Sequence, residues 1–186
     1  MADTASSGQT TVLRSGQPQA FPGMVADSGI KDDVSSFNLE TVDSIPFGSG
    51  VKWGGQRGSL LPTANNSALQ GIVVWNADHQ TGTYGDLDST GIKPNGALVV
   101  RRKGRIWVPV DAEYAVGDLT PGTSRGYCRF ETDGATNTVR GRWRASDDGH
   151  VDSAINQVVF VSTVILAADG TTKIAEVEVD FTSLQT

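Results

Sequence analysis

Cysteine is almost absent from this sequence, because Cys128 is the only one among 186 residues. A single cysteine excludes an intrachain disulfide, so the chain is not a disulfide-stapled secreted domain. Long apolar runs are also missing, and none approaches the roughly 20 residues that a membrane-spanning helix needs. The segment Met1–Thr11 is rich in Ser, Thr and Gly and lacks the apolar core of a secretory signal. We therefore expect synthesis in the cytoplasm of the producing cell.

An excess of basic residues is lacking too, since the formal net charge is −6 and the pI is about 4.8. This balance argues against general binding to nucleic acid or to an anionic membrane, both of which attract positive fields. Hydrophobic residues make up 38%, while the sequence holds 22 glycines. A core can form, but much of the chain must be loop, arm or interface, and turn-rich β structure is favoured over helix.

Catalytic motifs are missing as well. Each of the two histidines, His79 and His150, follows closely on aspartates, and a catalytic interpretation would make one of them an oriented acid or base. No Gly-x-Ser-x-Gly elbow supplies a nucleophile. Cys128 sits in an expected strand with no local base to lower its pKa. The histidines are better interpreted as solvated loop residues and the cysteine as a structural thiol, so we expect no enzyme.

Metal and cofactor signatures are equally sparse. Asp86, Asp88 and Ser89 are suggestive of a loop calcium site, but the spacing lacks the distal glutamate of a calcium-binding loop. No paired Cys/His spacing fits zinc, and the glycine pairs near the first strands lack the helix of a nucleotide-binding loop. We expect neither a metal nor a cofactor.

The patterns that are present predict strands. They cover residues 71–75, 97–102, 105–110, 127–131, 139–145, 157–166 and 173–181. Three hairpins are expected, with turns at Lys103-Gly104, Thr132-Asp133-Gly134 and Asp169-Gly170. The sequence predicts an all-β fold, a sandwich, jelly roll or barrel, with Val116-Gly117-Asp118 as a turn between strands.

The two strands of the last expected hairpin have different patterns. In the final strand, Ala175, Val177, Val179 and Phe181 alternate with acidic residues, which is typical of one core face and one solvated face. Its partner, residues 158–166, is apolar on both sides. That strand is expected to be covered by a second sheet or buried against another subunit.

The N-terminal part of the chain divides from this β-rich region. Residues 1–20 are polar, and an arm that orders against a partner and a frayed terminus are equally compatible with this pattern. Residues 21–50 are irregular and dotted with apolar side chains, with one short helical turn between Asp33 and Val42. Such a segment usually lies along another surface. Residues 51–186 are expected to form the β-rich domain.

Two groups of basic residues stand out. The first is Arg101, Arg102, Lys103 and Arg105 at the expected hairpin tip, and the second is Arg140, Arg142 and Arg144, which alternate along one expected strand. At period two the second group would form a ladder of guanidinium groups on one face. Pairing with acidic residues of the same chain and docking to an acidic protein surface are equally compatible with this pattern. Nucleic-acid binding is a distant third.

Several stretches in order resemble a known family. They are AFPGMVADSGIKDDVSSFNLE (20–40), IPFGSGV (45–51), LQGIVVWNADHQTG (69–82), GIKPNGALVVRRKGRIWVPV (91–110), the Val-Gly-Asp turn and the closing EVEVDF. In this order the chain resembles the phage structural cement, or decoration, proteins over roughly residues 21–181.

The resemblance implies a β-rich structural protein on the outer surface of an assembled tailed-phage capsid. The implied partners are the major capsid protein and further copies of the chain, with a homotrimer favoured over a dimer. The segment 21–47 would be an extended strap that clasps the coat, and residues 104–110 a core or trimer strand. Candidate apolar contacts in the strap are Phe21, Met24, Phe37 and Phe47. The family offers no catalytic residues.

Two other classes of function stay open. A carbohydrate-binding β-sandwich would use exposed aromatic residues such as Trp53, Trp75 or Tyr84, and it could be displayed on a virion. An enzyme of the β-barrel hydrolase kind would need a plausible acid/base pair. Glycan binding without affinity for capsids would favour the first, and activity lost on changing His79 or His150 would favour the second.

Overall fold

The computed structural model describes residues 20–26, 32–41, 44–63, 69–75, 91–130, 140–146, 151–152 and 157–182. The strands are β1 (Asp32–Phe37), β2 (Ile45–Pro46), β3 (Gly50–Trp53), β4 (Ser59–Leu60), β5 (Leu69–Val73), β6 (Gly91–Ile92), β7 (Ala97–Pro109), β8 (Tyr127–Arg129), β9 (Trp143–Arg144), β10 (Val151–Asp152), β11 (Val158–Phe160), β12 (Ile165–Leu166) and β13 (Lys173–Asp180). A short 3-10 turn, η1 (Gly55–Arg57), lies between β3 and β4. The all-β prediction is confirmed. No helix in the described ranges is long and apolar enough to cross a membrane.

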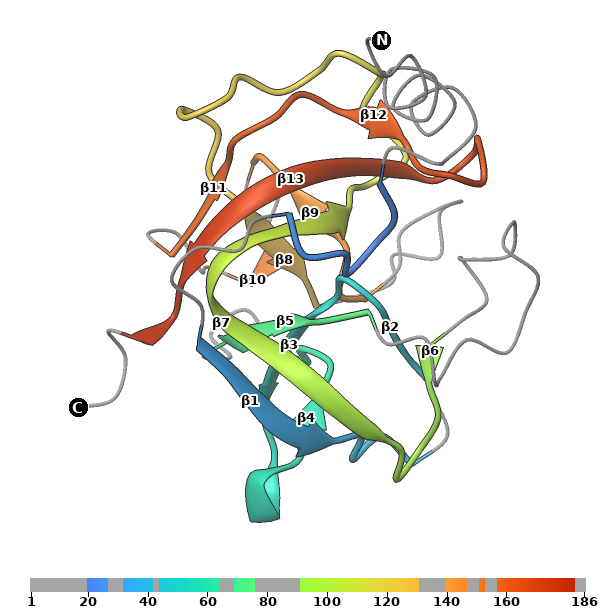
Figure 1. Cartoon of the computed structure of the whole chain (residues 1–186), viewed down its shortest axis with the longest axis vertical. Helices are drawn as coiled ribbons and strands as arrows, with labels where there is room; N and C mark the ends of the chain where they lie inside the picture. The colour runs from blue at the N-terminus through green and yellow to red at the C-terminus, as the bar shows by residue number, and fades with distance from the viewer. Residues whose placement is uncertain are drawn as a thin grey trace, which may run out of the picture.

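The main sheet has the strand order β11-β13-β7-β5-β3-β4, with β1 also paired to β7 and β12 to β13. Two smaller sheets, β10-β8-β9 and β2-β6, complete the described part of the fold (Figure 1). The path of the main sheet runs from β11 to β4 without closing into a barrel. A single parallel bridge from Asn38 to Ser59 brings the end of β1 beside β4. The architecture is therefore an open, curled sheet with small sheets packed on it.

The longest strand, β7, is continuous over 13 residues, so the predicted hairpin at Lys103-Gly104 is wrong. Each half of β7 has its own partners, because residues 97–103 pair with β1 and residues 103–109 pair with β13. Gly104 has a φ of 111°, a conformation that residues with a Cβ seldom adopt. The glycine therefore bends the strand at the position where the Lys103-Gly104 pattern predicts a hairpin turn. Figure 1 shows β7 curving through the middle of the molecule.

Residues 32–37 form β1, so the short helical turn predicted between Asp33 and Val42 is wrong. The register pairs Asp33 with Arg101 and Phe37 with Ala97. A single helical turn is unfavourable alone, whereas a long neighbouring strand supplies a full ladder of backbone hydrogen bonds. The segment 21–50 thus contributes β1 and β2 to the folded domain.

The predicted closing hairpin is confirmed, because β11 and β12 both pair antiparallel with β13. At its turn, Asp169 accepts hydrogen bonds from the backbone amides of Thr171 and Thr172, at 2.8 and 2.7 Å. Burial tends to raise the pKa of Asp169, but hydrogen bonds from Thr172 and Thr171 outweigh it, and the pKa is lowered. The carboxylate thereby stabilises the turn.

Other strand predictions also hold. In β13 and the residue after it, Ala175, Val177, Val179 and Phe181 are buried while Glu178 is exposed. β5 is buried throughout and lies between β7 and β3, as expected for a central strand. β8 and β9 pair antiparallel, and their predicted connecting turn lies outside the described residues.

The largest apolar cluster lies between the main sheet and the β10-β8-β9 sheet, and it draws on β5, β7, β8, β9, β11 and β13. Its largest side chain is Trp143, which is fully buried and donates a hydrogen bond from Nε1 to the Gly48 carbonyl at 3.0 Å. A second cluster around Ile45 and Val100 fills the curl of β3, β5 and the first half of β7. Burial of this apolar surface is the main driving force for the fold.

Candidate partner-binding surface

The first basic group begins with an arginine that is only 1% exposed, Arg101. Its Nε and Nη2 donate to the two carboxylate oxygens of Asp33, each at 2.9 Å, the bidentate geometry that an arginine fork favours. Nη1 donates to the Arg105 carbonyl at 3.2 Å. In the next residue, Arg102, the guanidinium Nη1 lies 3.5 Å from the carboxylate Oδ2 of Asp32. Both arginines therefore hold the start of β1 against β7.

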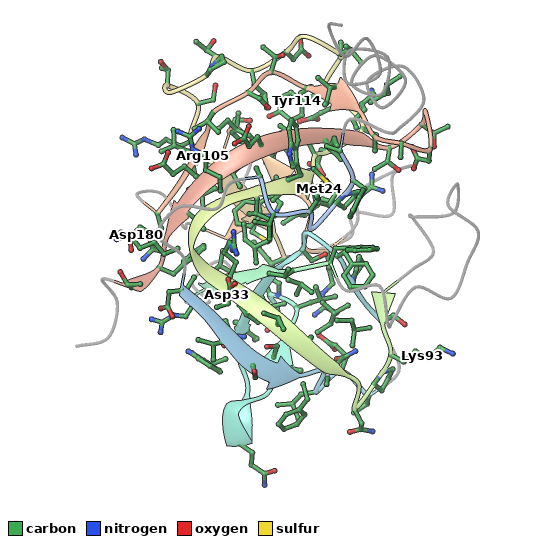
Figure 2. The ribbon with its side chains drawn as sticks, in the orientation of Figure 1. Met24, Asp33, Lys93, Arg105, Tyr114 and Asp180 are labelled. Carbon is green, nitrogen blue, oxygen red and sulfur yellow. The ribbon has the colours of Figure 1, made fainter. Side chains whose placement is uncertain are left out.

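Lys103 and Arg105 differ from these because they lie on the outer face of the sheet, where each side chain is close to half exposed. Lys103 Nζ donates to Asp180 at 2.9 Å, and Arg105 Nε donates to Glu178 at 3.2 Å. The Thr182 hydroxyl and Lys103 lower the pKa of Asp180 to about 2. The hydrogen bond to Asp180 also raises the pKa of Lys103. Figure 2 shows Arg105 and Asp180 on the same side of the molecule.

An open groove of about 670 Å³ runs along this outer face. Val159 and Val161 line it beside the ion pairs, and both are half-buried. The register places Val159 opposite Glu178, which in turn lies opposite Arg105. The apolar pattern on both sides of residues 158–166 predicts that this strand is covered by a second sheet or buried against another subunit. Within this chain, the valines stay partly accessible beside a charged row.

The second basic group does not form the predicted ladder along one strand. β9 has only two residues, and Arg140 lies in a turn before it. Arg140 donates to Glu40 at 3.3 Å, while Arg144 donates to Glu113 at 2.6 Å. Arg142 is half-buried. For Arg140 and Arg144 the structure thus shows the pairing with acidic residues of the same chain that the pattern left open.

The buried ion pair between Arg129 and Asp111 was not predicted from the sequence. Arg129 and Asp111 are 2% and 3% exposed, and Arg129 donates to Asp111 Oδ2 from Nη2 at 2.7 Å and from Nε at 3.0 Å. Arg144 lies 3.7 Å from the same carboxylate. Strand alternation gives no signal here, because Cys128, Arg129 and Phe130 are all buried in succession.

The four candidate apolar contacts of residues 21–50 lie in different environments. Phe47 is 3% exposed and belongs to the second core cluster. Phe21, Met24 and Phe37 are half-buried, and the Phe21 ring meets Trp75 edge-on with centroids 4.7 Å apart. Phe47 therefore acts within the core, while the other three keep accessible surface.

Two short motifs that are distant in sequence meet in space. The Gly23 amide donates to the Trp107 carbonyl at 2.7 Å, and the Trp75 amide donates to the Gly23 carbonyl at 2.8 Å. The Gly48 amide donates to the Val73 carbonyl at 2.9 Å. A Cβ on Gly48 would lie 2.9 Å from the Gly23 nitrogen. Pro-Gly-Met and Ile-Pro-Phe-Gly thus stack between the ends of β5 and β7.

Most of the residues weighed for catalysis or metal binding lie outside the described residues, namely His79, His150, Asp86, Asp88 and Ser89. Cys128 is buried in the largest core cluster. The described part of the chain contains no group of three or more His, Cys, Asp or Glu that could hold a metal. Of the aromatic residues considered for glycan binding, Trp53 is 42% exposed and Trp75 is half-buried, while Tyr84 is not described.

The sequence profile of the structural cement proteins, described as E217 gp24/Pam3 gp6, matches residues 9–179. This chain belongs to the phage structural cement protein family. Its resemblance to that family is confirmed over nearly the whole length, and the motifs that meet at Gly23 and Gly48 lie within the matched region. The cement protein is thus a capsid-stabilising structural protein of a phage particle.

A solved structure supports the same fold. A chain in the capsid of Myoviridae Phage XM1 superimposes with a TM-score of 0.60 and 14% sequence identity, over 86% of the cement protein and 89% of that chain. At this identity the likeness concerns the fold alone. None of the curated proteins matches this sequence.

Proposed function

We propose that this cement protein binds the outer surface of an assembled capsid and joins neighbouring major capsid protein subunits. The family match over residues 9–179 carries the proposal. A capsid is held by many weak interfaces and is strained by packaged DNA. A protein that contacts several subunits at once adds contacts that are lost only when all of them detach together. Binding the assembled lattice and not the free subunits stabilises the lattice by mass action.

The outer face of β7 and β13 supports this proposal as one contact surface. Lys103 and Arg105 are close to half exposed within their ion pairs, so carboxylates of a coat subunit can reach them. The half-buried valines of the groove add apolar area beside the charges. Arg101, Arg140 and Arg144 take part indirectly, because they hold β1 and the neighbouring loops in place.

The N-terminal part supplies a second contact in this proposal. Residues 1–20 are an arm, and residues 21–50 clasp the coat while their strands β1 and β2 attach them to the β-rich domain of residues 51–186. The half-buried side chains of Phe21, Met24 and Phe37 face the partner, and Phe47 anchors the segment in the core. An extended segment buries more interface per residue than a compact one, which suits a protein that fastens a lattice.

The assembled form in this proposal is a homotrimer, made in the host cytoplasm and carried on the outside of the virion. A symmetric oligomer presents the same contact several times to a symmetric shell. The protein works without a cofactor or a catalytic step and does not bind nucleic acid or membrane directly. Its net charge of −6 supports this last point, since it repels polyanions.

The test mixes the purified protein with capsids assembled without it and, separately, with unassembled major capsid protein. We expect saturable co-sedimentation with the capsids and a rise in the temperature at which they rupture. A variant with Lys103→Ser and Arg105→Ser should bind more weakly. Lys93→Ser is the matched control, because Lys93 is exposed and lies far from Arg105 in Figure 2. Wild-type protein that ignores intact capsids would overturn the proposal.

A further inference from the structure

The loop between β7 and β8 holds Val116 outward in a fixed turn. Val116 is 58% exposed, more than the other two exposed large hydrophobic residues of the described chain. The turn is closed on both sides, since the Asp118 amide donates to the Ala115 carbonyl at 3.1 Å and the Ala115 amide donates to Asp118 Oδ2 at 2.6 Å. The Gly117 amide donates to the Val164 carbonyl at 2.9 Å. An apolar side chain is thus displayed to solvent by a well-bonded loop.

The backbone of this loop is strained at one residue, Leu119. Leu119 has a φ of 75°, which is an outlier for a bulky residue. Its side chain packs inward against the largest core cluster. Such strain persists where the surrounding structure imposes it, and it is found at sites with a function. Here it lets Leu119 point into the core while Val116, three residues earlier, points away from it.

A second exposed apolar side chain lies on the segment that this loop contacts. Leu166 in β12 is 43% exposed. The Val164 amide donates to the Asp118 carbonyl at 2.9 Å, so the strand leading into Leu166 is hydrogen-bonded to the turn that carries Val116. Figure 1 shows the loop and β12 at the same end of the molecule. We call Val116 and Leu166 the terminal apolar patch.

The surroundings of the terminal apolar patch are acidic. Glu113 and Asp118 are exposed on the loop itself, and Asp169 lies in the turn after β12. Two cations lie near these three carboxylates, because Arg144 pairs with Glu113 at 2.6 Å and Lys173 donates to the Ala112 carbonyl at 2.6 Å. Two copies of this patch would bring like charges together, which disfavours self-association through it. A basic rim around an apolar pocket is the complementary partner surface.

We infer that the terminal apolar patch inserts into an apolar pocket of a coat subunit that is rimmed by Lys and Arg. The inference rests on the proposed function and adds a contact distinct from the charged groove. A few well-packed, desolvated side chains near the centre of an interface carry most of its affinity, while a charged rim sets orientation and rate. The hydrogen-bonded turn lowers the cost of ordering the patch on binding.

The test measures the affinity of variants for capsids assembled without the cement protein. The variant with Val116→Ser and Leu166→Ser should bind at least ten-fold more weakly, with an unchanged thermal unfolding midpoint because both side chains are exposed. Trp53→Ser is the matched control and should bind as wild type does, since Trp53 ends β3 next to η1, at the other end of the molecule (Figure 1). The single variant Val116→Thr conserves the shape of the side chain and should also bind capsids more weakly. Its affinity provides a second test that does not depend on whether the double variant folds.

The acidic rim is tested with Glu113→Gln and Asp118→Asn, which keep hydrogen-bonding oxygens for Arg144 and the Ala115 amide. Binding should weaken several-fold and become less sensitive to salt. Wild-type affinity in the Val116 and Leu166 variants, beside normal binding by the wild type, would overturn the patch inference and leave the proposed function standing. A change in oligomeric state with unchanged capsid binding would overturn it too, in favour of a second copy. Absence of wild-type binding would instead contradict the proposed function.

Discussion

Arg101 and Lys103 are two residues apart on β7, yet their ion pairs have different roles. Arg101 is 1% exposed and meets Asp33 through two hydrogen bonds, whereas Lys103 and Asp180 are 40% and 48% exposed. Removing one partner of a buried pair leaves the other charge without compensation, and this is costly. Exposed pairs are screened by water and contribute little to stability. The pair made by the buried Arg101 therefore supports the fold, whereas the exposed pair of Lys103 and Asp180 contributes little to stability.

This contrast leads to a stability prediction. Asp33→Asn should lower the free energy of unfolding by about 3 kcal/mol, because the guanidinium of the buried Arg101 loses its charged partner. Lys103→Gln should leave the urea midpoint within experimental error of the wild type. Urea denaturation of both variants checks the prediction, and equal losses in the two would contradict the assignment of roles.

The Asp180 carboxylate gives a prediction in pH. Its pKa is lowered from 3.8 to about 2 by the Thr182 hydroxyl and by Lys103. Because the folded-state pKa lies below the unfolded one, the stabilisation is complete above about pH 3.8 and is lost as the pH falls toward 2. NMR titration should give a midpoint near 2 for Asp180, and Thr182→Val should move it upward. A wild-type midpoint near 3.8 would refute the hydrogen-bonding account.

Gly48 gives the sharpest test of the stacked motifs. An added Cβ would lie 2.6 Å from Pro109 Cδ and 2.9 Å from the Gly23 nitrogen, at a φ of 75°. Gly170 has a similar φ of 70° but open space around it. Gly170→Ala should cost about 1–2 kcal/mol for the backbone alone. Gly48→Ala should cost about 1–3 kcal/mol more, for overpacking. Thermal or urea unfolding of the two variants compares these costs, and equal losses would show that the two turns are not packed tightly together.

At the residue scale, sequence reasoning identified the basic residues but not their partners. Asp111 lies 18 positions from Arg129, and Asp33 lies 68 positions from Arg101. Such partners are known only once the strand order is known, since charge patterns in sequence carry no distance information. The burial of Arg129 was not predicted, because Cys128, Arg129 and Phe130 are all buried in succession. The strand therefore lacks the period-2 alternation that distinguishes a buried face from an exposed one.

At the scale of elements, the patterns set by local chemistry were predictable and those set by tertiary pairing were not. The alternation of β13 follows from one buried and one solvated face, and the closing turn from Asp169-Gly170. The glycine at position 104 is compatible with a turn or with a bend, and the choice depends on which strands lie on each side. Residues 32–37 likewise form a strand because their backbone groups pair with β7.

The alternation of β13 predicts unequal effects at adjacent positions. Val177 is fully buried in the largest core cluster, while Glu178 is exposed. Val177→Ala should lower the free energy of unfolding by about 2 kcal/mol through lost burial and a cavity. Glu178→Ala should change it by no more than about 0.5 kcal/mol. Urea denaturation measures both, and a larger loss at Glu178 would mean that the strand is turned over.

At the scale of the molecule, the cement protein combines a core that is buried within the chain with surfaces whose charged and apolar side chains are only partly covered. The ion-paired groove lies along one face, and the terminal apolar patch lies at one end. The sequence predicted the β-rich class and the family, because turn residues and the order of motifs can be recognised in a single sequence. It did not predict the patch, since an isolated exposed valine in a turn is unremarkable until the loop geometry is known.

The central claim is that this protein stabilises a phage capsid by binding several coat subunits from outside. A three-dimensional reconstruction of the intact particle tests it most directly. We expect density for the β-rich domain on the outer surface of the shell, touching at least two coat subunits and repeated with the symmetry of the lattice. Density confined to the inside of the shell or to the tail, or a domain touching one subunit alone, would contradict it.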